Sequence, residues 1–229
     1  TLSSGRSGAP PTVEVRDLVA RYGPRTILDG VSVAVRPAEI RVILGGSGSG
    51  KSTLLKHMIG MLAPAGGEVR LLGQDLTALD EADREQLLRR VGVLFQGSAL
   101  LNSLTVHENV ALPLRQDPSL PGDVIDEIVR MKLALVELAH AGPLYPSELS
   151  GGMKKRAGLA RAMALDPEVL FCDEPSAGLD PITAAQLDEL LINLRDRFRM
   201  SVVVVTHELA SVELISDRVV MLHKGAIIA

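Results

Sequence analysis

The sequence predicts an α/β fold with a mainly parallel core sheet, an antiparallel β subdomain and an inserted helical subdomain. Three observations support this fold class. A glycine-rich loop at residues 45–53 lies between an apolar run and a stretch that suits a helix. Apolar runs at residues 169–174 and 201–206 have the composition of buried parallel strands. A helical block at residues 98–149, punctuated by prolines, separates the loop from these later strands.

The first part of the chain supplies the antiparallel strands. Residues 1–11 are small, polar and end in prolines, so we expect a disordered leader ahead of a single domain at 12–229. Apolar and polar residues alternate at 13–19 and again in a pair of segments over 27–35, with a turn at 21–24 between them. This alternation predicts half-exposed strands that pair as an antiparallel sheet just before the loop.

The rest of the chain follows the pattern of an α/β core with an insertion. A buried strand is expected at 40–44, directly before the loop, and a helix at 54–61, after it. Charged residues at 80–90 begin acidic and end basic, which suits the dipole of a helix. The remaining expected elements are strands at 68–72 and 91–95, helices at 123–138, 154–165 and 181–194, and a hairpin at 218–228.

The composition limits the possible partners. The chain has 229 residues, of which 46% are hydrophobic and only 2% aromatic, so one large α/β unit with an aliphatic core is expected. A net charge of −4 argues against non-specific binding to nucleic acid. The single cysteine, Cys172, excludes an internal disulfide and favours a reducing compartment. No run approaches the roughly 20 apolar residues of a membrane-spanning helix, so another subunit must cross any membrane at which the protein works.

The glycine-rich loop has the pattern of a phosphate-binding loop, G-x-x-x-x-G-K-[ST]. Glycines let successive backbone N–H groups point at phosphate oxygens, and the following helix adds the positive end of its dipole. Lys51 can then reach the β- and γ-phosphates, and the Ser52 hydroxyl can bind Mg²⁺. The alternative, a flexible loop that matches by chance, is disfavoured by the strand and helix around it. The predicted nucleotide-binding residues here are Gly45, Gly46, Ser47, Gly48, Ser49, Gly50, Lys51, Ser52 and Thr53.

The apolar run at 169–174 ends in two acids, Asp173 and Glu174. In a fold with a phosphate-binding loop, the terminal Asp173 is expected at Mg²⁺. Glu174, one residue later, is placed to polarise a water that attacks the γ-phosphate. The alternative is an ordinary acidic turn. His207 follows the strand at 201–206 on the side where α/β folds bind ligands, which favours a γ-phosphate contact over a structural histidine.

Two further features are weak when taken alone. Tyr22, in the turn ahead of the loop, can stack on a flat heterocycle, although its position favours an ordinary half-buried tyrosine. Ser150, Gly151 and Gly152 precede a helix and leave backbone N–H groups for an anion. The same three residues are also an ordinary helix cap.

Five pieces in this order resemble the nucleotide-binding domain of ABC transporters: the glycine loop, Gln96 after a strand, the run from Leu149 to Met153, the strand at 169–174, and His207. The resemblance covers residues 13–228. It implies a P-loop NTPase of the ABC ATPase type, with an ATP-binding α/β core at 12–97 and 166–229. The helical subdomain at 98–165 then carries the signature motif.

The resemblance also implies roles for residues and partners. ATP is bound between two copies arranged head to tail, so that Ser150, Gly151 and Gly152 of one copy complete the site of the other. By this resemblance Tyr22 stacks on adenine, so we no longer interpret it as an ordinary half-buried tyrosine. Gln96 contacts Mg²⁺ and the attacking water, and Asp180 acts across the dimer. The helical subdomain receives the coupling helices of a transmembrane permease.

Longer stretches at 95–101, 109–115 and 147–156 are similar to the ATPases of MCE-type lipid transport systems, which include the Mla phospholipid system. Met153, where ABC ATPases commonly have Gln, agrees with this branch. The similarity implies a place on the cytoplasmic face of the inner membrane, with an MCE-domain substrate-binding protein as a further partner. ATPases of this branch are longer, so we expect that the C-terminus at Ala229 is truncated.

An ATPase that powers lipid transport is therefore the leading hypothesis. A soluble ABC-type ATPase acting in DNA repair or translation needs a coiled-coil insertion or two tandem ATPase halves, and the 229 residues contain neither. A nucleotide-binding regulator without turnover is disfavoured by the presence of Glu174.

Overall fold

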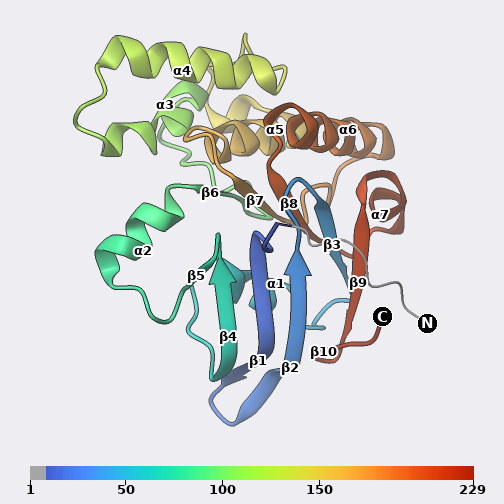
Figure 1. The fold of residues 1–229 in the computed structure, drawn as a ribbon. Coiled ribbons are helices and arrows are strands. Elements are labelled where there is room, and N and C mark those ends of the chain that lie inside the picture. The colour runs from blue at the N-terminus through green and yellow to red at the C-terminus, as the bar shows by residue number, and fades with distance from the viewer. Residues whose placement is uncertain (1–8) are drawn as a thin grey trace.

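The computed structural model describes residues 9–229, so most of the expected leader, residues 1–8, lies outside the described residues. The described chain forms two sheets (Figure 1). The central sheet has, in spatial order, β10 (Ala226–Ile227), β9 (Arg218–His223), β3 (Ile40–Leu44), β8 (Ser201–Thr206), β7 (Val169–Asp173) and β6 (Val91–Leu94). The second sheet has β2 (Arg25–Val35), β1 (Val13–Tyr22), β4 (Gly66–Leu71) and β5 (Gln74–Asp75).

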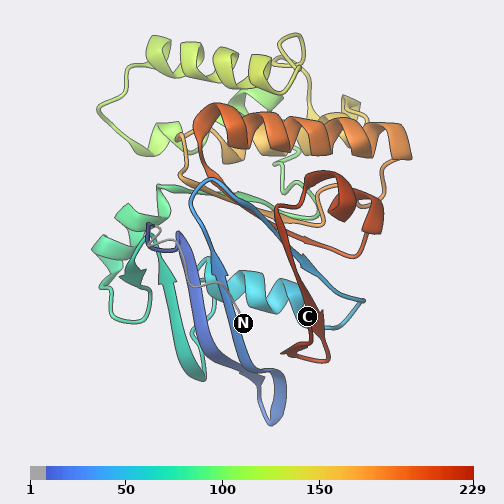
Figure 2. The same cartoon turned by 45° about the vertical axis from the view of Figure 1, so that its right-hand side comes forward.

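Helices cover both faces of the central sheet. They are α1 (Lys51–Met58), α2 (Glu81–Leu88), α3 (Val106–Ala111), α4 (Gly122–Leu135), α5 (Gly151–Ala162), α6 (Pro181–Phe198) and α7 (Leu209–Ile215), with short 3₁₀ turns at Leu114–Gln116 and Pro146–Glu148. Helices α3 to α6 form a layer at the top of Figure 1, above the central sheet. Helix α1 lies between the central sheet and the antiparallel sheet, which the turned view makes plain (Figure 2).

The inner strands β3, β8 and β7 of the central sheet are buried on both faces, as their apolar composition predicted, whereas β9 near the edge is largely exposed. From β9 to β6 the strands pair in parallel. Along β8, Val202 and Val204 pack under the helical layer, whereas Val203 and Val205 pack against α1 and the antiparallel sheet. This alternation is the two-residue period of a strand, and it explains why β8 is apolar at four successive positions. The carboxyl ends of β3, β7 and β8 therefore lie side by side at one edge.

The antiparallel sheet also forms as predicted, with β1 paired to β2 and to β4. Two details differ from the expectation. Residues 25–35 form one continuous strand instead of a pair of segments, and Tyr22 is the last residue of β1 instead of part of the turn. The tighter turn follows from Gly23, whose positive φ of 57° reverses the chain within two residues.

Several helices also differ from the expectation. Helix α5 runs over Gly151–Ala162 instead of 154–165, and α6 continues to Phe198 instead of ending at residue 194. Helix α1 begins at Lys51 and not at residue 54, because Gly50, with φ 107°, ends the loop and the next residue is already helical. The seven-residue α7 is not predicted by the sequence, since so short a segment shows little periodicity. Within the described chain, residues 98–165 hold helices and no strand, but their assignment as a separate subdomain stays a prediction.

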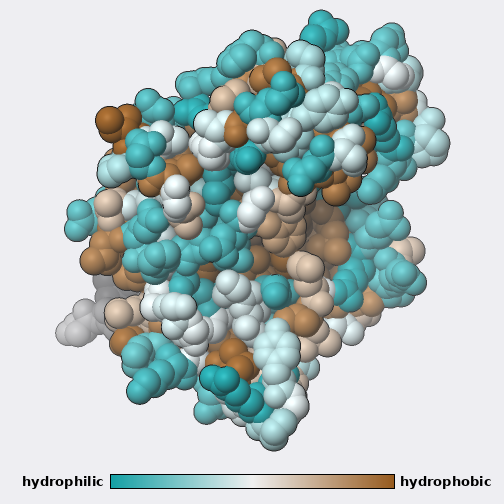
Figure 3. Space-filling view, turned by 180° about the vertical axis from the view of Figure 1, so that it is seen from behind, coloured by the Kyte–Doolittle hydropathy of each residue, from teal (hydrophilic) through white to brown (hydrophobic). Residues whose placement is uncertain are grey.

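Seen from behind, hydrophobic side chains gather in a recess between the helical layer and the sheets below it (Figure 3). Among residues 9–229, none of the helices has the length and apolar character that crossing a bilayer requires.

Phe171 is the largest of the fully buried side chains, and it lies on β7, beside the strand end that carries the two acids. We expect Phe171→Ala to lower the free energy of unfolding by about 3–5 kcal/mol, because the lost apolar contacts leave a cavity under α1. Urea unfolding followed by circular dichroism measures this. Met61→Ala, at a side chain that is 58% exposed, is the control and should change stability by about 0.5 kcal/mol or less. A Phe171→Ala protein as stable as the control would contradict this account of the core.

Candidate functional site

The predicted phosphate-binding loop runs from the end of β3 into α1, and two of its glycines are required by close packing. A Cβ atom on Gly45 would stand 2.4 Å from the backbone oxygen of Leu222. Gly50 combines φ 107° with a Cβ position 2.7 Å from the Leu28 side chain. Neither position accepts a side chain without distortion. By contrast, a Cβ atom on Gly46 or Gly48 would meet no other atom within 4 Å, so these two glycines face open space.

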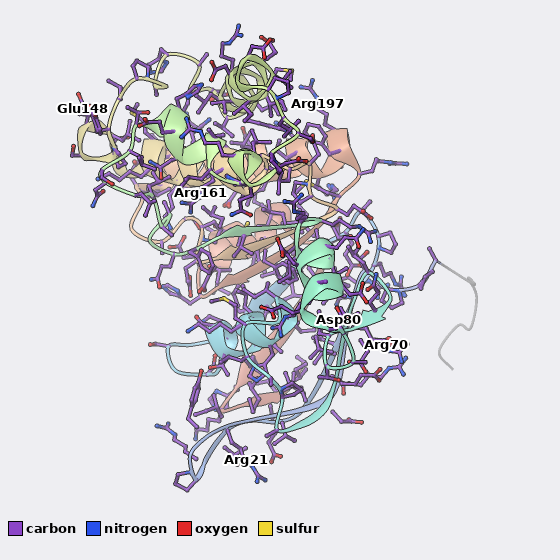
Figure 4. All side chains as sticks on the ribbon, turned by 90° about the vertical axis from the view of Figure 1, so that its left-hand side faces the viewer. Arg21, Arg70, Asp80, Glu148, Arg161 and Arg197 are labelled. Atoms are coloured by element: carbon purple, nitrogen blue, oxygen red, sulfur yellow. The ribbon has the colours of Figure 1, made fainter. Side chains whose placement is uncertain are left out.

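A cavity of about 290 Å³ opens beside this loop. Its walls come from the loop, from α1 and from β2, through Arg25, Ile27, Gly48, Gly50, Lys51, Ser52 and Thr53. Tyr22 pairs with Arg25 across the β1–β2 hairpin, and its ring is 50% exposed. Because paired residues on adjacent strands are close neighbours, Tyr22 lies next to the cavity wall. Arg21, beside it, marks the outer end of this hairpin (Figure 4).

The Lys51 ammonium lies inside the loop and is buried. It donates to the backbone oxygens of Gly45 at 2.7 Å and Gly46 at 3.1 Å, and it stands 3.5 Å from Oε1 of Glu174. Ser47 is exposed in the same loop, while the Ser49 hydroxyl is buried. The loop therefore holds one positive charge at its centre, directed toward the acids at the end of β7.

Asp173 and Glu174 end β7 beside the loop. Oδ1 of Asp173 accepts a hydrogen bond from the Ser52 hydroxyl at 3.3 Å. Burial raises the pKa of the Asp173 carboxyl, and the Ser52 hydrogen bond offsets part of that rise. The adjacent Glu174 raises it further by charge repulsion. A carboxylate in such a place is poorly balanced by the protein itself and is stabilised by an added cation.

Glu174 is held from two sides. Its backbone has φ 49°, an uncommon conformation for a residue other than glycine, and its N–H donates to the Val205 oxygen at 2.9 Å. Its carboxylate is buried, with Oε2 2.9 Å from Nδ1 of His207 and Oε1 facing Lys51. The structure thus brings together three side chains from three strand ends, Lys51 after β3, Glu174 after β7 and His207 after β8, as the parallel order of the strands predicts.

Gln96 lies just beyond β6, which pairs in parallel with β7. Its side chain is exposed, and among the described residues it has no hydrogen bond to Ser52 or Asp173. Its backbone oxygen instead accepts from the Lys155 ammonium at 2.5 Å, and the same ammonium donates to the Glu174 backbone oxygen at 2.9 Å.

A second cluster forms where α5 meets α6. Ser150 caps α5 by accepting from the Met153 N–H at 3.2 Å, and Gly151 and Gly152 begin the helix. Asp180 caps α6, accepting two backbone N–H groups, each at 3.1 Å. A Cβ atom on Gly152 would come within 2.5 Å of Thr183 in α6, so the two helix starts are in close contact. Within residues 9–229, no hydrogen bond or ion pair joins Ser150, Gly151, Gly152 or Asp180 to the phosphate-binding loop.

Residues 28–177 match the family model described as ABC transporter, and this range includes the loop, Gln96, the α5 start and both acids. The chain belongs to the ABC transporter family. It is an ATP-binding cassette and an ATPase. The order of its strands and the residues at its site agree with this family. The roles of individual site residues in binding and hydrolysis stay predictions.

This cassette is similar to two groups of curated proteins and to solved cassettes. It is 40% identical over 217 residues to the intermembrane phospholipid transport system ATP-binding protein MlaF of Haemophilus influenzae, covering 95% of this chain and 82% of that protein. It is 38% identical over 213 residues to the probable ribonucleotide transport ATP-binding protein mkl of Mycobacterium tuberculosis, covering 93% and 59%. The dimeric cassette MJ0796 bound to ADP and Pi superposes with a TM-score of 0.86 at 29% identity, covering 95% and 97%.

Sequence reasoning missed three residues near the site. Arg25 and Ile27 line the cavity. In the sequence, only their closeness to Tyr22 suggests a place near the nucleotide. Lys155 carries a clearer signal. It falls one helical turn before Leu159 on a buried face of α5, so helical periodicity places a charged side chain where an apolar one is expected.

Lys51→Ala removes the positive charge at the centre of the loop. We expect ATP turnover to fall on the order of 100-fold or more, because the transferring phosphoryl group loses a fixed cationic partner. A coupled ATPase assay, with nucleotide binding measured by calorimetry, checks this. Lys56→Ala, an exposed lysine on the same helix, is the matched control and should keep parent turnover. Equal turnover in both variants would remove Lys51 from the site.

Proposed function

We propose that this chain is the ATP-hydrolysing subunit of a transporter that moves phospholipid, working as a head-to-tail dimer docked on a membrane permease. The observation that carries the hydrolytic part is the buried Glu174 carboxylate between Lys51 and His207 beside the phosphate-binding loop. The similarity to MlaF along most of both chains supports phospholipid as the transported substrate. The similarity to mkl also supports a role in transport, although mkl is named for ribonucleotide and not for phospholipid transport.

In this proposal the chain's residues divide the work of hydrolysis. Backbone N–H groups of residues 45–53 and the Lys51 ammonium bind the β- and γ-phosphates, and the open side of Gly46 and Gly48 admits them. Glu174 accepts a proton from the attacking water, and His207, 2.9 Å from that carboxylate, orients it and contacts the γ-phosphate. Gln96 orients the water, and Tyr22 stacks on adenine beside the cavity.

Mg²⁺ fits the residues at the end of β7. Ser52 Oγ and Asp173 Oδ1 are hard oxygen donors 3.3 Å apart, and neighbouring ligands in an octahedral Mg²⁺ shell stand about 3 Å apart. Among residues 9–229 no cluster of three or more His, Cys, Asp or Glu could hold the ion alone, so phosphate oxygens and water must complete its shell. The bound ion neutralises charge that develops on the phosphates.

The dimer follows from the separation of the two clusters. Ser150, Gly151 and Gly152 expose N–H groups at the start of a 12-residue helix, yet no contact within the described chain brings them to the loop. A second copy turned head to tail carries them to the open side of the loop, with Asp180 at the junction. The dimeric MJ0796 cassette supports this arrangement.

The permease is proposed to dock beside the helical subdomain. A cavity of about 320 Å³ lies there, and its apolar lining suits the end of a partner helix. The lining residues are Val91, Gly92, Val93, Phe95, Pro113, Arg161, Ala162 and Leu165. Docking of this kind places the chain peripherally on the cytoplasmic face of the inner membrane, with an MCE-domain protein as the further partner. A role in DNA repair or translation is not favoured, because the longest helix at residues 98–165, α4, has 14 residues and no coiled coil is present there.

Glu174→Gln should keep ATP bound and accumulate a dimer, because the neutral amide cannot accept the proton while the phosphate contacts remain. Size-exclusion chromatography with ATP and Mg²⁺ measures the dimer, and a phosphate-release assay measures turnover. Adding Ser150→Arg to this variant should abolish the dimer but leave ATP bound to single copies. Hydrolysis at the parent rate in Glu174→Gln would show that another residue is the base. A dimer that survives Ser150→Arg would remove Ser150 from the shared site.

The lipid part is tested with the assembled transporter. We expect the chain to co-purify with a membrane permease, and ATP turnover of that complex in phospholipid vesicles to move a labelled phospholipid between membranes. Mass spectrometry of the purified complex identifies the bound lipid, and the Lys51→Ala complex is the control that should move none. An ATP-hydrolysing complex that carries and moves no lipid would overturn the substrate and leave the ATPase assignment intact.

A further inference from the structure

The loop that follows β6 has a strained backbone conformation. Ser98 and Ala99 both adopt the left-handed conformation, with φ 59° and 50°, although neither is glycine. Each such residue costs on the order of 1 kcal/mol or more, so the conformation persists only where neighbouring groups fix it. Gln96, at the start of this loop, is one of the proposed site residues, so its placement depends on whatever holds the loop.

The contacts that fix this loop come from one face of α5. Arg161 donates to the Ala99 oxygen at 2.7 Å and to the Ser98 oxygen at 2.9 Å. Six residues earlier, Lys155 donates to the backbone oxygen of Gln96. Figure 4 shows Arg161 on the underside of the helical layer, toward the sheet.

Gly158 stands midway between these two cations on the same face, since residues three apart share a helix face. A Cβ atom there would lie 3.1 Å from the Ser98 Cβ and 3.0 Å from Leu94. The glycine thus lets the helix approach the loop closely enough for both hydrogen-bond sets to form.

Lys155 also reaches the acids. Its ammonium bridges the backbone oxygens of Gln96 and Glu174, which follow β6 and β7 respectively. Burial lowers the pKa of Lys155, and the nearby Asp173 and Glu174 oppose that change. Removing an ammonium from water costs free energy, and the Lys155 ammonium is paired here with two neutral backbone oxygens. A role in packing alone therefore does not explain why a lysine occupies this position.

We propose that Lys155 and Arg161 are positioning residues that tie the Gln96 loop and the Glu174 backbone to α5. The inference rests on the proposed function, in which the start of the same helix, at Ser150, contacts ATP bound to the partner copy. Helix α5 then joins the two ATP sites of the dimer: one end completes the partner's site, and Lys155 holds the hydrolytic groups of its own site.

The test is Lys155→Met, which keeps the length of the side chain and removes the donors. We expect kcat to fall about 10- to 100-fold with KM changed less than about threefold, since a misplaced hydrolytic group slows the reaction but does not touch ATP. ATP-binding stoichiometry and Tm are measured on the same samples. A merely structural role would instead lower Tm and the bound fraction, with parent kcat per bound site. Lys155→Gln, which restores an N–H donor, should recover part of the rate.

Lys154→Met is the matched control, because it removes the same charge one residue earlier. Its ammonium has no hydrogen bond or ion pair with the residues that the structure describes, and we expect parent kcat. Gly158→Ala is an independent variant that keeps both cations but pushes the Ser98 backbone away, and it should lower kcat with KM unchanged. If Lys155→Met does not fold, Gly158→Ala tests the proposal in its place.

The outcomes separate the two levels of the proposal. Parent-like kcat in Lys155→Met, or in Gly158→Ala where that variant carries the test, would overturn this inference while leaving the ATPase assignment in place. No turnover in the wild-type chain, with the permease present, would overturn the proposed function and this inference with it. A kcat in Lys154→Met as low as in Lys155→Met would overturn the inference alone, because the loss would then not depend on the hydrogen bonds of Lys155.

Discussion

A lysine ammonium inside a curl of backbone carbonyls is the interaction on which the rest of the site depends. Lys51 satisfies two oxygens of its own loop and stands 3.5 Å from the Glu174 carboxylate. That geometry requires three separate elements to meet: β3 to deliver the loop, α1 to begin at Lys51, and β7 to end at the acids. The parallel order of the central sheet supplies this meeting, because it aligns the carboxyl ends of β3, β7 and β8. The antiparallel sheet then adds the cavity wall through Arg25 and Ile27.

The parts of the site that sequence could predict are those built from local chain. The loop is contiguous, so the spacing of its glycines was enough to predict it, although the steric reasons for Gly45 and Gly50 are contacts with Leu222 and Leu28 that spacing does not reveal. Glu174 and His207 could be predicted because each follows a buried strand, and the carboxyl ends of parallel strands lie at the same edge of an α/β sheet. Tyr22 needed the family resemblance, because its place beside the cavity depends on the pairing of β1 with β2. Helical periodicity marks Lys155 as a charged residue on a buried face, but it does not reveal the acceptors, which are backbone oxygens 19 and 59 residues away. Arg161 could not be predicted, since its acceptors are backbone oxygens 62 and 63 residues away.

Two clusters on one chain, one around the loop and one at the start of α5, explain why a single copy is an incomplete enzyme in the proposed mechanism. Helix α5 connects them, with Ser150 at its first turn and Lys155 in its second. The same helix thus carries both the residues proposed to meet the partner's ATP and the lysine proposed to position the hydrolytic groups of its own site. Arg161 extends the contact to the strained loop and to the cavity where the permease is proposed to dock.

The left-handed backbone at Glu174 has a consequence for how this protein can change over evolutionary time. The left-handed conformation costs on the order of 1 kcal/mol or more, and the adjacent Asp173 repels the buried Glu174 carboxylate, whereas Lys51 and His207 stabilise it. A glycine at this position would relieve the backbone strain, but it would also take away the proposed base and the acidic partner of the buried Lys51 ammonium. The substitution that suits this backbone best is therefore one that the proposed chemistry does not tolerate.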